Sequence, residues 1–272
     1  MRRRRAWRDL AGGLLILAAI LGASAALQAG WAQQNVYSGA PPALLLRWLT
    51  ISMAAASLLL PLCAAVLGAG AAPAGSEFEE TQATLLTHLT PADVVIGRLA
   101  AALWPLITAV LASAALWLGV QVGWRPVAGA DRAYAKIAES HLVLLSSVYM
   151  FGALAQMAAL HRRSGSLPVR GAAAACGLVA LCVAAVFLAN PLIRRSADPK
   201  RLIEASLLVN PCAACTTALD LDILRTNWLY DRSEAPAYDF VYPPPQATAA
   251  LYLVAGTGLL AIGAARLRRV YR

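Results

Sequence analysis

The chain has 272 residues, of which 60% are hydrophobic and only 14% charged, with a mean hydropathy of +0.62. This composition excludes an ordinary soluble domain. The net charge of +9 raises the question of nucleic-acid binding, but the basic residues sit at the ends of apolar runs and are not interleaved with aromatic residues. We therefore expect contact with membrane lipids and not with nucleic acid.

Apolar runs long enough to cross a bilayer recur along the chain. A hydrocarbon layer roughly 30 Å thick needs about 20 apolar residues in a helix. Six runs predict transmembrane helices near residues 11–30, 43–70, 99–120, 138–160, 171–193 and 247–265. Backbone polar groups in lipid must be satisfied internally, so helices are favoured over a barrel of short strands. The predicted fold is all-α, a polytopic protein whose residues 1–272 form a single transmembrane domain.

The first run has two interpretations. Its arginines, apolar core and small triplet Ala23-Ser24-Ala25 resemble a cleaved export signal, and the arginine pair hints at the twin-arginine route. However, the run continues to about Gly30, which is long enough to span the membrane. An uncleaved first helix is the favoured interpretation, and cleavage would leave five spans.

The distribution of arginines predicts the orientation, because Lys and Arg in short flanking segments favour the cytoplasmic side. With six spans, the basic clusters at 2–8, 162–170 and 266–272 all lie on one side. The cluster at 194–201 lies opposite and argues against this arrangement, although long exported segments obey the rule weakly. We expect an integral protein of the bacterial inner (cytoplasmic) membrane, with both termini cytoplasmic.

The segment between the second and third predicted spans, residues 71–98, combines acidic residues with helix-forming ones. Ser76 and Glu79 have the spacing of a capping box, and the following leucines can form one apolar strip. The sequence Thr90-Pro91-Ala92-Asp93 then restarts a helix that leads into the third span. A helix, a turn and a second helix are predicted, and the plain alternative is a solvated loop.

Motifs of soluble enzymes are mostly absent from the sequence. The chain has two lysines, Lys136 and Lys200, and neither stands in a GxxxxGK phosphate loop, so this polypeptide does not belong to that class of nucleotide hydrolase. Cys212 and Cys215 form a CxxC that is open to three interpretations: an incidental pair, a structural disulfide or a redox centre. A metal site there would need two further ligands.

The segment EFEETQATLLTHLTPADVVIGR resembles the permeases of type-2 ATP-binding-cassette (ABC) exporters. The likeness is carried by Glu79, Glu80, Thr81, Leu85, Leu86, Thr87, Thr90, Asp93, Gly97 and Arg98. The glycine-threonine pair usual after the acidic residues is missing, and His88 stands where proline is common. Two further regions fit the same family, namely the loop HRRSGSLPVRGAAAACG before the fifth span and Asn210-Pro211, which resembles the start of re-entrant helices before the sixth.

The resemblance implies a half-transporter without catalytic residues. Two permease chains, identical or related, would bind two ATP-binding cassette subunits, which would hold ATP and Mg, so this chain would need no cofactor. The coupling segment, residues 76–98, would contact the cassette subunit. Its candidate coupling residues are Glu77, Glu79, Glu80, Thr81, Leu85, Leu86, His88 and Asp93.

Few polar residues fall at membrane depth. Glu139, His141 and Gln156 are candidates for a substrate pathway, and the competing interpretations are hydrogen bonding between helices and simple placement at the membrane interface. The external segment, residues 194–246, is predicted to form one or two short re-entrant or external helices. Two other functions stay open: a membrane thiol-disulfide redox protein using Cys212 and Cys215, and a membrane scaffold that transports nothing.

Overall fold

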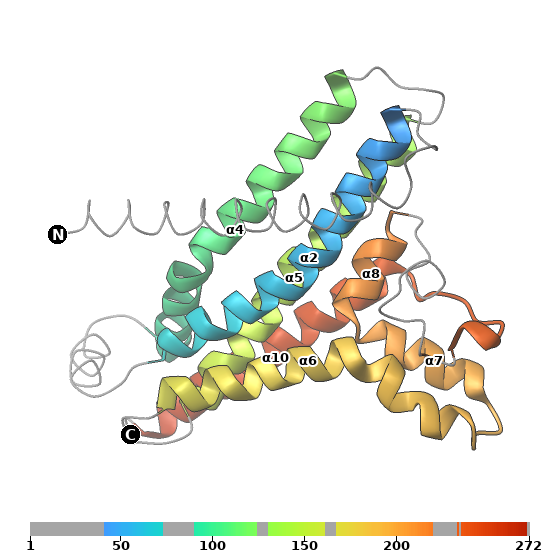
Figure 1. Ribbon diagram of the computed structural model, residues 1–272. Coiled ribbons are helices and arrows are strands. Elements are labelled where there is room, and N and C mark those ends of the chain that lie inside the picture. The colour runs from blue at the N-terminus through green and yellow to red at the C-terminus, as the bar shows by residue number, and fades with distance from the viewer. Residues whose placement is uncertain are drawn as a thin grey trace. The chain divides into compact units, whose positions relative to one another are not determined.

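The computed structural model describes residues 41–72, 90–123, 130–160, 167–219, 233 and 235–270 (Figure 1). Across these residues the regular secondary structure is helical, as predicted. The elements are α2 (Pro41–Gly70), α4 (Pro91–Gly123), α5 (Ala130–Ala159), α6 (Leu167–Ile193), α7 (Pro199–Leu208), α8 (Pro211–Thr217), the 3₁₀ helix η2 (Ala235–Ala237) and α10 (Pro245–Val270).

Five helices in the described part of the chain are long and apolar enough to cross a membrane. Their spanning segments are Ser52–Gly70, Pro91–Gly119, Tyr134–Ala159, Val169–Ile193 and Pro245–Arg269. They correspond to the second to sixth predicted spans and make the chain an integral membrane protein. The predicted first span, 11–30, lies outside the described residues. The helix of the third predicted span, α4, begins at Pro91, eight residues before the predicted start of that span at residue 99.

Proline marks the start of most of these helices. It is the first residue of α2, α4, α7, α8 and α10, a position where its missing N–H would have no helical partner and its fixed φ suits the helix. The residue before the proline supplies the cap in α7 and α8, where the side chains of Asp198 and Asn210 accept backbone N–H bonds. Local sequence thus fixes where these helices begin.

The chain divides into two compact units, and each long helix contributes one segment to each unit. Unit 1 comprises residues 1–59, 108–144 and 182–248, and unit 2 comprises 60–107, 145–181 and 249–272.

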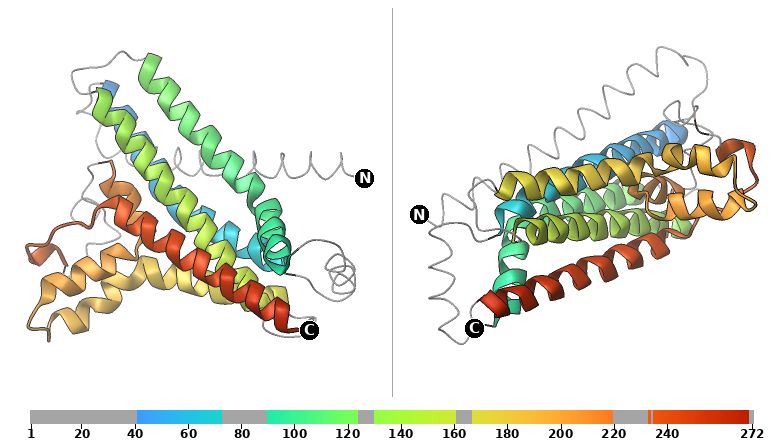
Figure 2. Two further views of the ribbon diagram at one scale, coloured as in Figure 1. Left: turned by 180° about the vertical axis from the view of Figure 1, so that it is seen from behind. Right: turned by 90° about the horizontal axis from the view of Figure 1, so that it is seen from below.

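In unit 2 the helix α5 lies among the other long helices (Figure 2). Small residues let its neighbours approach it closely. A Cβ atom added to Gly68 of α2 would lie 2.2 Å from the Gly152 carbonyl oxygen of α5, and one added to Gly171 of α6 would lie 2.7 Å from that of Ala155. On α10, Gly256 lies against Tyr149 in the same way. Such small-residue contacts are how membrane helices gain packing without a hydrophobic driving force.

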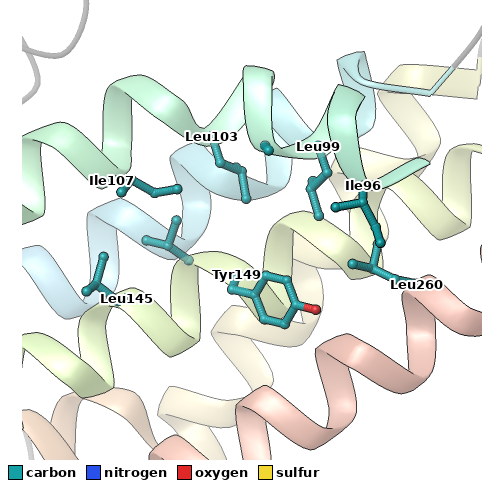
Figure 3. A pocket seen from close by; sticks show the side chains of 9 residues that line it. Ile96, Leu99, Leu103, Ile107, Leu145, Tyr149 and Leu260 are labelled. Atoms are coloured by element: carbon teal, nitrogen blue, oxygen red, sulfur yellow. The ribbon is translucent and has the colours of Figure 1, made fainter. Parts of the chain in front are cut away.

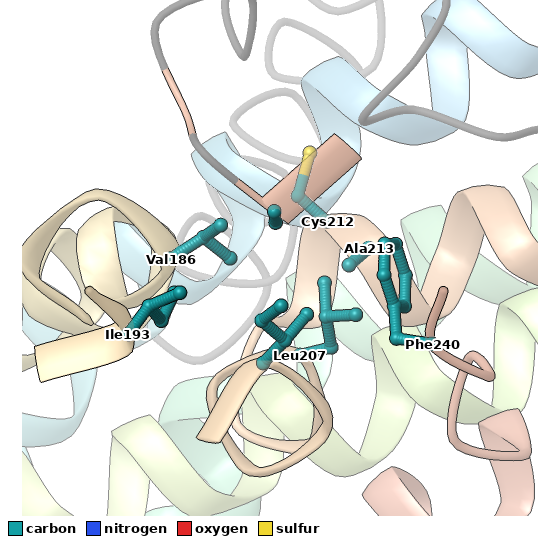
Figure 4. Close-up of a cluster of buried hydrophobic side chains, with 8 residues drawn as sticks. Val186, Ile193, Leu207, Cys212, Ala213 and Phe240 are labelled. Atoms are coloured by element: carbon teal, nitrogen blue, oxygen red, sulfur yellow. The ribbon is translucent and has the colours of Figure 1, made fainter. Parts of the chain in front are cut away.

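In unit 1 the two short helices α7 and α8 pack against the C-terminal part of α6 (Figure 4). Their shared core contains Val186 and Ile193 from α6, Ile203 and Leu207 from α7, Cys212 and Ala213 from α8, and Ala235 and Phe240 from the following segment. The prediction of one or two short helices within residues 194–246 is confirmed. This core shows that they fold as part of the helical body.

Candidate functional site

Most of the predicted coupling segment lies outside the described residues. This applies to Glu77, Glu79, Glu80, Thr81, Leu85, Leu86 and His88. The described part begins at Thr90, so the structure reports on the junction between this segment and the membrane. The predicted first helix of the pair stays a prediction.

The junction itself is a capping box. Thr90 donates from its backbone N (2.9 Å) and its Oγ1 (2.6 Å) to Oδ2 of Asp93, and the Asp93 backbone N donates to Thr90 Oγ1 (3.2 Å). Val94 N then donates to the Thr90 carbonyl, which forms the first helical bond of α4. This reciprocal pattern satisfies donors that would otherwise be orphaned at a helix start. The prediction that Thr90-Pro91-Ala92-Asp93 starts a helix into the third span is confirmed.

Gln156 links α5 to the first turns of α4 in unit 2. Its side chain is 1% exposed, and its Nε2 donates to the Val95 carbonyl at 3.1 Å. Its Oε1 is buried without a hydrogen-bond partner within the part of the chain that the structure describes. A flipped amide would point oxygen at oxygen, so the geometry fixes this orientation. Gln156 therefore joins the two helices, at the cost of one unsatisfied acceptor.

His141 and Glu139 make interhelical bonds in unit 1. The buried His141 ring has Nδ1 at 2.7 Å from the Ile137 carbonyl, which can only accept, so Nδ1 donates. Its Nε2 lies 3.3 Å from Ser113 Oγ of α4. Glu139 Oε1 accepts from Gln246 Nε2 of α10 at 2.7 Å. Each of the three candidate pathway residues thus takes part in a different interhelical bond.

Cys212 and Cys215 are buried in α8, and no disulfide joins them. Cys212 Sγ donates to the Ala54 carbonyl of α2 at 3.7 Å, and Cys215 Sγ donates to the Ser140 carbonyl of α5 at 3.6 Å. Burial raises the pKa of the Cys212 thiol, and burial with the neighbouring Cys212 raises the pKa of Cys215 well above its ordinary value. Thiol-disulfide exchange needs an accessible thiolate, and this environment favours packed, neutral thiols.

Asn210 is the main polar anchor of the short helices. It is fully buried, and its Oδ1 accepts from the backbone N of Cys212 (2.9 Å) and of Ala213 (3.1 Å). Its Nδ2 donates to the Val183 carbonyl of α6 at 3.2 Å. The start of α8 is therefore tied to α6. A second bond, from Thr248 Oγ1 to the Leu208 carbonyl at 3.0 Å, ties α10 to the end of α7.

Sequence reasoning did not single out several residues that build these contacts. Ser113 and Thr248 are isolated hydroxyls in apolar runs, and Gly68 and Gly152 are glycines like many others in the chain. The spacing of small residues gives a weak signal for close packing, but it does not say which partner each residue meets.

Comparison with known proteins identifies no relative. No protein-family model matches the chain, and neither a curated protein nor a solved structure matches it.

Proposed function

We propose that this chain is the permease subunit of an ABC exporter. In this proposal the acidic segment before α4 docks on a separate ATP-binding cassette subunit in the cytoplasm. A second permease chain completes the membrane pathway, and ATP hydrolysis by the partner drives alternating access. The termini lie in the cytoplasm of a bacterial cell, and the membrane is the inner one.

The observation that carries the proposal is the continuity of α4. The helix starts at the capping box that ends the acidic segment and runs for 33 residues through its span. Its 33 residues are more than the about 20 that a helix needs to cross a hydrocarbon layer roughly 30 Å thick, and Pro105 lies within it. A displacement of the acidic segment therefore acts directly on a helix that crosses the membrane.

The contacts of α4 with α5 supply the next step of the coupling. Gln156 holds the Val95 carbonyl, and Leu103 packs on Gly152, where an added Cβ would lie 2.8 Å from its Cδ1. Since glycines of α2, α6 and α10 also lie directly against α5 in unit 2, movement of α4 reaches the helix that these neighbours share. Packed cores switch between discrete arrangements and do not deform continuously.

Purification of the intact membrane complex tests the proposal. A tagged full-length chain, extracted in mild detergent, is expected to carry a subunit with a phosphate loop and ATPase activity. The double variant Leu85→Ala/Leu86→Ala should lose that subunit, because buried apolar contacts dominate such interfaces. The matched control Leu188→Ala/Leu192→Ala changes exposed leucines of α6 and should retain it. A chain that purifies without any ATPase, with activity in cells unaffected by the leucine variants, would favour the scaffold interpretation.

A further inference from the structure

We draw no further inference here: the strongest candidate, the apolar groove between α4, α5 and α10 in unit 2 (Figure 3), carries nothing, because its lining is aliphatic apart from Tyr149 and nothing in the structure shows what covers it.

Discussion

The close packing of Gly68 in α2 against the backbone of Gly152 in α5 gives a sharp stability prediction. A Cβ at residue 68 would lie 2.2 Å from the Gly152 carbonyl oxygen and 2.7 Å from its Cα. The first distance is about 1.2 Å short of the 3.4 Å at which ordinary contact begins. Both opposing atoms belong to the backbone, so no side-chain rotation relieves the clash. In Gly68→Ala, α2 must therefore move away from α5.

The expected change in the free energy of unfolding is the sum of two opposing contributions. Overpacking costs typically 1–3 kcal/mol, and a backbone clash belongs near 3 kcal/mol. Alanine regains about 1 kcal/mol of helix propensity. The expected net loss is about 2 kcal/mol in the free energy of unfolding, measured by circular dichroism during titration with denaturing detergent. Gly177→Ala is the control, because its Cβ would meet nothing within 4 Å. Equal stability of the two variants would refute the close packing of α2 on α5.

Four further predictions concern polar contacts. Gln156→Leu should have a free energy of unfolding within about 1 kcal/mol of that of the unmodified protein, because the change removes a hydrogen bond and an unsatisfied acceptor together. A folded variant without transport activity would instead assign Gln156 to the pathway. Asn210→Ala should lower the free energy of unfolding by about 2 kcal/mol in the same assay, and Asn210→Ser, which can form a shorter cap, should recover part of this loss. Equal losses in the two variants would contradict a capping role. Asp93→Ala should speed amide hydrogen exchange in the first turn of α4, while Asp93→Glu, which can restore the box, should slow it again; unchanged exchange in Asp93→Ala would count against the capping box. The raised pKa of the Cys212 and Cys215 thiols means that their stabilising effect is fully present below about pH 8.5, the unfolded value, and is lost as the pH rises through the folded values. Maleimide should react with them slowly in the folded protein and rapidly after denaturation, whereas rapid reaction at neutral pH in the folded state would restore the redox interpretation.

Features that depend on neighbouring residues in the sequence could be predicted. Apolar runs located five spans, and Thr90-Pro91-Ala92-Asp93 located the start of α4, because a cap and a proline act on the residues beside them. The apolar run of the third span begins near residue 99, after Asp93 and Arg98. The helix that carries this span begins earlier, at Pro91, where the cap and the proline place it.

Features that depend on tertiary packing could not be predicted. Gly68 and Gly177 look alike in sequence, yet the first meets a backbone and the second meets open space. The polar residues within α5 indicate that this helix is buried, but they do not say which helices surround it. His141 and Gln156 could be singled out as polar residues within an apolar run, but their partners, Ser113 and the Val95 carbonyl, lie on another helix.

The side of the membrane on which the acidic segment lies tests the proposed coupling most directly. The measurement is labelling of Glu79→Cys in intact cells with a membrane-impermeant maleimide, compared with Lys200→Cys in the segment after α6. The coupling proposal predicts that Glu79→Cys reacts only after the membrane is opened, whereas Lys200→Cys reacts from outside. Labelling of Glu79→Cys in intact cells would contradict a cytoplasmic contact with an ATP-hydrolysing partner.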